Sequence, residues 1–163
     1  MKRRKMMYDF TTAKYIGILC APQDNVSTTY LKGFLQYLSK KGIKYSVFGY
    51  FDQNKIPDNF LYLKDMDFIT TKELNLFFIP KSPNAKKFVQ EQFDMLINCC
   101  LADYFAVEYM AHLSMARFKV GITRDGEMGY DLTIDIKKNR TVEYFLKNLE
   151  LYLTNLTSKI KQT

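Results

Sequence analysis

The sequence predicts an α/β fold: a three-layer sandwich with a mostly parallel, Rossmann-like sheet, an antiparallel edge and a C-terminal helix. Apolar, β-branched runs of strand length alternate with segments of helical periodicity. The chain has 163 residues, 47% of them hydrophobic, which suits one domain with a substantial core. No apolar run approaches the roughly 18 residues of a membrane-spanning helix.

The first part of the chain has the order strand, helix, strand. Residues 14–20 (KYIGILC) form an apolar run that ends at the turn-rich APQDN. Ser27 to Thr29 can cap a helix that ends at Gly42, a residue suited to the left-handed position after a helix. Residues 43–50 (IKYSVFGY) alternate as a strand does. This order is typical of a right-handed crossover between parallel strands.

The middle of the chain gives weaker signals. Residues 60–63 and 66–69 are short strand candidates. Residues 74–80 (LNLFFIP) are either a strand or a packed loop, because periodicity alone does not separate the two. Pro83 opens a helix that runs to about Gln92, since proline in the first turn gives up no hydrogen bond.

A regular pattern returns with FDMLINCC, residues 93–100, which indicates a central buried strand. Asp103 is placed to cap a following helix over residues 104–116. Asp94 and Asp131 precede apolar strand residues, so we expect their carboxylates to accept backbone hydrogen bonds or to pair with Lys and Arg at the strand starts.

The last strands are residues 118–122 and 130–136. The turn between them is too short for a helical crossover, which predicts an antiparallel pair at the sheet edge. A final helix from about Thr141 carries an apolar stripe that should dock on the sheet.

Positive charge is concentrated at the two ends of the chain. Of the net charge of +7, residues 1–5 (MKRRK) contribute four and residues 159–163 two, which leaves +1 for the body. We therefore expect residues 1–10 to be a flexible basic tail and residues 11–163 to be a single α/β domain. A basic patch on the folded surface is not indicated, so specific nucleic-acid binding is not expected. The polar residues after MKRRK do not form the apolar region of a signal peptide, which predicts a cytoplasmic protein without membrane partners.

The residues that could carry catalysis or metal chemistry are few. Cys20, Cys99 and Cys100 could converge at one sheet edge, but three thiolates need a fourth ligand and His112 is the only histidine. His112 lies too far along its helix to reach Cys100. Neither a phosphate-binding glycine motif nor a convincing carboxylate pair is present. We therefore expect no catalytic residues, no metal and no cofactor.

If a ligand site exists, it should lie outside the carboxyl ends of the parallel strands. Two loops meet there, one after the first strand and one after FDMLINCC. The side chains that these loops offer to a ligand are Asp24, Asn25, Ser27, Thr28, Asn98, Cys99 and Asp103.

Several segments resemble a family of uncharacterised, small Rossmann-like proteins from Bacteroidetes. They are AKYIGIL, FDMLIN, LSMARFKVGI and YDLTIDI before a final helix. The resemblance implies a fold and a host range but no activity. Residues 93–121 are also similar to the acceptor-side half of heptosyltransferase-like glycosyltransferases. This chain lacks both their glycine-rich loop and the residues to build their donor-binding half.

These observations favour a non-catalytic domain that binds a protein partner or an anionic small molecule at the carboxyl edge of the sheet. The alternative is a transferase-like enzyme, a glycosyltransferase-related half domain that needs a second subunit. A third possibility, weak RNA association through the basic tails, follows from charge alone.

Overall fold

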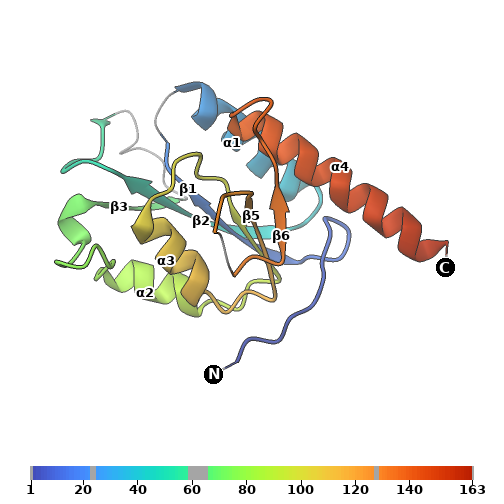
Figure 1. Ribbon diagram of the computed structural model, residues 1–163, viewed down its shortest axis with the longest axis horizontal. Coiled ribbons are helices and arrows are strands. Elements are labelled where there is room, and N and C mark those ends of the chain that lie inside the picture. The colour runs from blue at the N-terminus through green and yellow to red at the C-terminus, as the bar shows by residue number, and fades with distance from the viewer. Residues whose placement is uncertain (1, 23–24, 59–65, 127–128, 163) are drawn as a thin grey trace.

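The computed structural model describes residues 2–22, 25–58, 66–126 and 129–162 (Figure 1). Within them the strands form one six-stranded sheet in the order β3-β2-β1-β4-β5-β6, and every pairing is parallel. The strands are β1 Tyr15–Cys20, β2 Lys44–Phe51, β3 Met66–Thr70, β4 Met95–Asn98, β5 Phe118–Ile122 and β6 Leu132–Ile134. The helices are α1 Asn25–Lys40, α2 Pro83–Gln90, α3 Phe105–Leu113 and α4 Val142–Lys161.

The helices cover both faces of the sheet, which confirms the predicted three-layer α/β fold (Figure 1). On one face, α1 and α4 pack on a core that includes Leu38, Ile97 and Phe145. On the other face, α2 and α3 pack on Phe93 and Leu96, among others. The alternating side chains of β4 therefore enter opposite cores. None of the helices in the described part of the chain is long and apolar enough to cross a membrane.

Glycine, proline and capping side chains mark several of the helix ends. Gly42 has a φ of 70° and follows α1, as predicted for a residue after a helix. Ser82 caps α2, whose first residue is Pro83, and Thr141 caps α4 by accepting the N–H of Tyr144 at 3.1 Å. The caps expected at Ser27–Thr29 and at Asp103 are wrong. The helix α1 already begins at Asn25, and α3 begins after Tyr104, which makes no side-chain cap.

The predicted antiparallel edge is also wrong, because β6 runs parallel to β5. The described residues between the two strands, 123–126 and 129–131, form no helix, and Tyr130 packs against the core on the α2/α3 side. Gly121 leaves room for the ring of Tyr130 against the strand, because a methyl group there would lie 2.8 Å from that ring. A connection this flat needs fewer residues than a helical crossover.

One strand is shorter than predicted, and of the two alternatives for residues 74–80 the structure shows the loop. The strand expected over residues 93–100 is confined to Met95–Asn98, so Cys99 and Cys100 follow the strand. Residues 74–80 form a loop closed by an isolated bridge between Leu74 and Pro80. The strand candidate at residues 60–63 lies outside the described residues.

Carboxylates at the amino edge of the sheet join strands to one another, as expected. Asp94 accepts the N–H groups of Lys14 and Tyr15 at 2.8 and 3.1 Å. Asp131 accepts the N–H of Lys119 at 2.8 Å and pairs with Arg3 through two hydrogen bonds of 2.8 Å. Residues 1–10 thus contribute contacts to the domain, and their independent mobility stays a prediction.

Candidate functional site

The carboxyl ends of β1 and β4 lie side by side, with Leu19 opposite Asn98. The chain leaves β1 towards β2 on one side and leaves β4 towards β5 on the other. Such a switch in direction leaves a crevice between two loops, and open α/β sheets bind ligands in that crevice. This is the edge where the sequence predicts a site.

A polar cluster fills the β4 side of this edge. The side chain of Asn98, in a residue that is only 2% exposed, donates to Glu108 Oε1 at 3.0 Å and to the Tyr130 hydroxyl at 2.7 Å. Tyr130 donates in turn to Glu108 Oε2 at 2.8 Å, and Asn98 Oδ1 accepts the N–H of Cys100 at 3.1 Å. The cluster joins β4, α3 and the β5–β6 connection, and its polar groups are occupied by one another.

Two arginines hold the segment that follows β4. Arg124 donates to the carbonyls of Cys100, Leu101 and Ala102 at 2.5, 3.1 and 3.3 Å, and Arg140 donates to that of Leu101 at 3.3 Å. Arg124 Nε also lies 3.8 Å from Glu108 Oε1. Burial raises the pKa of Glu108, and the Tyr130 hydrogen bond and the Arg124 charge only partly offset this. These contacts give the loop a defined shape.

The three cysteines lie inside the protein. Cys20, Cys99 and Cys100 are 4%, 2% and 1% exposed. Cys20 and Cys99 lie in the core under α1 and α4, whereas Cys100 lies in the core under α2 and α3. Cys99 Sγ donates to the Leu19 carbonyl at 3.2 Å, and burial raises its pKa to about 12. Buried, neutral thiols are poor nucleophiles and poor metal ligands.

The predicted ligand residues divide into three groups. Asp24 lies outside the described residues, and Asn25 and Ser27 are placed only as backbone in the first turn of α1. Thr28, Asn98 and Cys99 are buried. Asp103 is exposed in the loop between β4 and α3. The loops that carry these residues meet at one edge, as predicted, but Asn98 and Cys99 make contacts inside the protein.

A pocket of about 350 Å³ opens at the same edge, on the β2 side. The Tyr50 hydroxyl donates to Asp52 Oδ1 at 2.9 Å, and burial together with this hydrogen bond raises the pKa of Tyr50. The rings of Tyr50 and Tyr104 meet edge to face, with their centroids 5.1 Å apart. The lining residues come from the ends of β1 and β2 and from the loop before α3: Pro22, Tyr50, Phe51, Asp52, Gln53, Pro57 and Tyr104.

Sequence reasoning missed this pocket, although one signal for it was present. Asp52 follows the apolar strand β2 directly, so its carboxylate stands at the carboxyl edge of the sheet. The contribution of Tyr104 depends on the placement of β4 next to β1, which residue spacing does not give.

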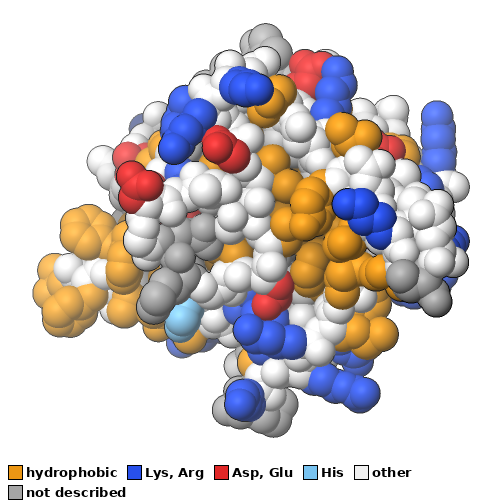
Figure 2. Space-filling view, turned by 45° about the vertical axis from the view of Figure 1, so that its right-hand side comes forward, with side chains coloured by type: hydrophobic (Ala, Val, Ile, Leu, Met, Phe, Trp, Pro, Cys, Tyr) orange, Lys and Arg blue, Asp and Glu red, His pale blue; other side chains and the backbone are white. Residues whose placement is uncertain are grey.

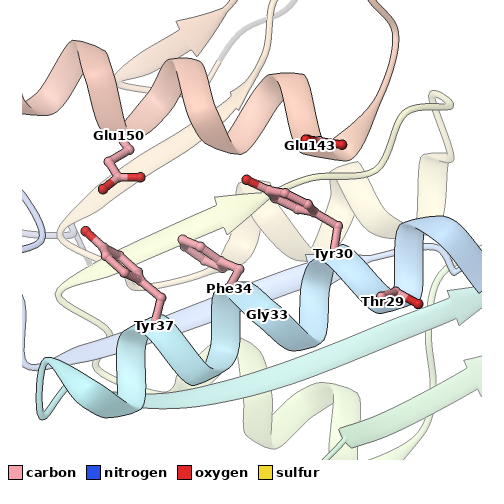
Figure 3. Close-up of a pocket in the computed structure, with 7 residues that line it drawn as sticks. All are labelled: Thr29, Tyr30, Gly33, Phe34, Tyr37, Glu143 and Glu150. Carbon is pink, nitrogen blue, oxygen red and sulfur yellow. The ribbon is translucent and has the colours of Figure 1, made fainter.

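A wider groove of about 590 Å³ lies between α1 and α4. Tyr30, Phe34 and Tyr37 extend from α1 towards α4, which contributes Glu143 and Glu150 (Figure 3). Burial and a hydrogen bond to Glu150 raise the pKa of Tyr37. Phe34 belongs to the core on this face of the sheet and Tyr30 and Tyr37 pack against it, so packing between the two helices explains the aromatic wall.

The family match covers nearly the whole chain. Residues 1–156 match a family of unknown function, DUF6913. The chain belongs to that family. Among the curated proteins, none matches this DUF6913 chain. The host range implied by the Bacteroidetes resemblance and the likeness to heptosyltransferase-like enzymes stay predictions.

A solved structure shares the fold of this DUF6913 protein. It is the crystal structure of an exopolyphosphatase-related protein from Bacteroides fragilis, with a TM-score of 0.59 and 17% sequence identity. The alignment covers 88% of this chain and 41% of that one, so this chain spans less than half of its neighbour. At this identity the likeness concerns the fold alone.

Within the described residues, histidines, cysteines and carboxylates do not gather in groups of three or more that could hold a metal ion. What the carboxyl edge offers is the Asp52 carboxylate and three aromatic residues, two of them tyrosines, around a small pocket. Those groups can hold a ligand by hydrogen bonds and ring contact.

Proposed function

We propose that this chain is a non-catalytic binding domain whose ligand occupies the pocket at the carboxyl ends of β1 and β2. One observation carries the proposal: the pocket lies beside the switch point of the sheet and combines Asp52 with the rings of Tyr50 and Tyr104. A pocket of about 350 Å³ suits a small molecule.

The lining residues also indicate which ligand chemistry fits. Asp52 accepts hydrogen bonds, so hydroxyl or amino groups suit that end of the pocket, and a negative charge there would be repelled. The exposed part of the Tyr104 ring can pack against a flat ring. An anionic ligand therefore has to place its charge away from Asp52. A protein partner remains the second occupant, and it would insert one side chain here.

The test is a thermal shift screen of the full chain with nucleosides, nucleotides, sugar nucleotides and inorganic phosphate. A ligand present at 100 times its Kd should raise Tm by about 5–10 °C for a protein of this size. Asp52→Asn keeps the shape of the pocket and should weaken binding about tenfold or more, because it removes the charged acceptor.

Glu150→Gln is the matched control, since it changes one carboxylate in the groove between α1 and α4. A hit that responds to Glu150→Gln but not to Asp52→Asn would move the site to the groove. If no compound shifts Tm, the small-molecule proposal fails.

The enzymatic alternative, a glycosyltransferase-related half domain, has one structural argument. The fold also occurs within a longer chain, since the alignment covers 41% of the solved exopolyphosphatase-related protein, so a domain of this fold can form one part of a larger protein. The polar cluster around Asn98 gives this alternative little support, because Glu108 is already occupied by Asn98 and Tyr130. Cytoplasmic localisation stays a prediction alongside both functions.

A further inference from the structure

The loop after β3 displays three consecutive large apolar side chains to solvent. Leu76, Phe77 and Phe78, called here the apolar tip, are 95%, 75% and 66% exposed. Orange side chains project from the left-hand end of the molecule in Figure 2, the end where Figure 1 places this loop. Single exposed apolar residues are common, but a projecting group of three indicates a surface that binds a membrane or another molecule.

The loop holds the apolar tip in a defined shape. The N–H groups of Phe77 and Ile79 donate to Asn75 Oδ1 at 2.8 and 3.1 Å, and that of Phe78 donates to the Asn75 carbonyl at 3.0 Å. The Asn75 N–H donates to the Ile79 carbonyl at 3.0 Å. Phe78 has a φ of 59°, which a bulky residue adopts only where the surroundings enforce it. The backbone N–H groups of four residues of the loop are thus paired within it.

The residues next to the apolar tip in the sequence carry mostly positive charge. Between Thr71 and Gln90 the chain has four lysines and one glutamate. The lysines are all exposed: Lys72, Lys81, Lys86 and Lys87. The glutamate, Glu73, is engaged by the N–H and the hydroxyl of Thr70, each at 2.7 Å. Lys72 and Lys81 thus flank the apolar tip along the chain, one on each side, and the nearest carboxylates beyond this window are Asp67 and Glu91.

We propose that the apolar tip inserts into the surface of an anionic phospholipid bilayer, with the surrounding lysines on the lipid headgroups. Apolar side chains next to Lys and Arg bind at the boundary between headgroups and acyl chains, and anionic lipids strengthen the attachment. Pairing backbone polar groups lowers the cost of entering this layer, and the loop pairs the N–H groups of Asn75, Phe77, Phe78 and Ile79 internally. Surface attachment of this kind requires no spanning helix.

A protein partner is less well matched to the same features. Strand addition to this loop would need unpaired backbone N–H groups, whereas four of the loop's N–H groups are already paired within it. The apolar tip also projects from the surface, so a protein would need a deep apolar cavity to cover it. A bilayer accommodates a projecting tip of any outline.

The chain has no tryptophan, which allows a direct measurement. Phe77→Trp places a single fluorophore on the apolar tip, and Leu151→Trp places one on the exposed side of α4 as a control. Each full-length variant is mixed with vesicles of pure phosphatidylcholine or of phosphatidylcholine with phosphatidylglycerol. We expect a blue shift, and quenching by brominated acyl chains, for Phe77→Trp on the anionic vesicles only.

Sedimentation with the same vesicles tests the contributions of the individual residues. Phe77→Ser/Phe78→Asn should bind about tenfold more weakly or worse, because it removes both rings. Asn at position 78 tolerates the positive φ, so the loop is kept. Lys72→Gln/Lys81→Gln should also weaken binding, and Leu151→Gln should not.

Three results would overturn the proposal: wild-type protein that stays in the supernatant of anionic vesicles, a Phe77→Trp spectrum that lipid leaves unchanged, or binding that survives loss of both rings. Light scattering in solution measures the oligomeric state and so tests the alternative that the apolar tip mediates self-association. A wild-type oligomer that becomes monomeric in Phe77→Ser/Phe78→Asn would assign the apolar tip to self-association instead.

Discussion

At the scale of single residues, burial determines what the cysteines can do. Adjacent thiols after a strand resemble a reactive pair in the sequence, yet Cys99 and Cys100 enter different cores. The Leu19 carbonyl accepts the Cys99 S–H, and burial keeps all three thiols neutral. Their role is to fill space on both sides of β4.

The thiols should therefore resist labelling in the native protein. With a pKa of about 12, Cys99 is thiolate in only about one molecule in ten thousand at pH 8. We expect Ellman's reagent to react with less than one equivalent over minutes in buffer and with all three cysteines in concentrated urea. Rapid release of one equivalent from native protein would show that one thiol is accessible.

At the scale of elements, periodicity and caps could be read directly from the sequence. The run KYIGILC, the helix that ends at Gly42 and the stripe of α4 all depend on near neighbours in the chain, and all three are present. The direction of β6 was not predictable in this way. The connection to β6 places the Tyr130 ring against Gly121, and no local pattern indicates that contact.

The candidate site could also be predicted only in part, because some of its features are local in sequence and others depend on long-range contacts. The edge where it should lie was predictable, because parallel strands end together. The pocket was not, because its residues come from three separate segments and meet only after β1, β2 and β4 are assembled. Asn98 was singled out correctly as a strand-end polar residue, but its partners Glu108 and Tyr130 occupy it.

Two glycines in different elements should respond in opposite ways to the same substitution. A methyl group at Gly17 in β1 would lie 2.6 Å from the ring of Phe93, which is fully buried. Gly17→Ala should therefore lower the free energy of unfolding by about 1–3 kcal/mol. Gly33 in α1 has open space around it, so Gly33→Ala should raise the free energy by about 0.5–1 kcal/mol.

Urea denaturation of both variants at one pH gives the comparison, and each serves as the other's control. If the two variants have equal urea midpoints, the Phe93 ring moves aside at little cost in free energy.

At the scale of the whole molecule, the first residues join the start of the chain to the last strand of the sheet. The Arg3 guanidinium makes two hydrogen bonds to Asp131, next to β6, and a third of 3.1 Å to the Arg117 carbonyl. Burial alone would raise the pKa of Asp131, but the Arg3 contacts and the Lys119 N–H bring it below its ordinary value.

Arg3→Ala should lower the free energy of unfolding by about 2 kcal/mol at pH 7, since it removes two charge-assisted hydrogen bonds to the Asp131 carboxylate. The folded-state pKa of Asp131 is the lower one, so this contribution is complete above the unfolded-state pKa of about 3.9 and is lost as the pH falls below it. The difference between wild type and Arg3→Ala should shrink in acid. Urea denaturation at several pH values measures it.

Lys5→Ala is the matched control. Lys5 lies 3.5 Å from the same carboxylate but is largely exposed, so its removal should change the free energy of unfolding by less than about 0.5 kcal/mol. Equal losses in both variants would show that the effect comes from net charge and not from the Arg3 geometry.

The strand order has a consequence for how the chain is synthesised. β2 and β3 add to one side of β1 in sequence order, and β4, β5 and β6 then add to the other side. Each new strand can therefore pair with a strand that has already emerged from the ribosome. No strand has to insert between two strands that are already paired. Until Met95 emerges, however, one edge of β1 is left without its partner. A nascent chain stalled before β4 should expose that edge to chaperones, and one extended past Asn98 should not.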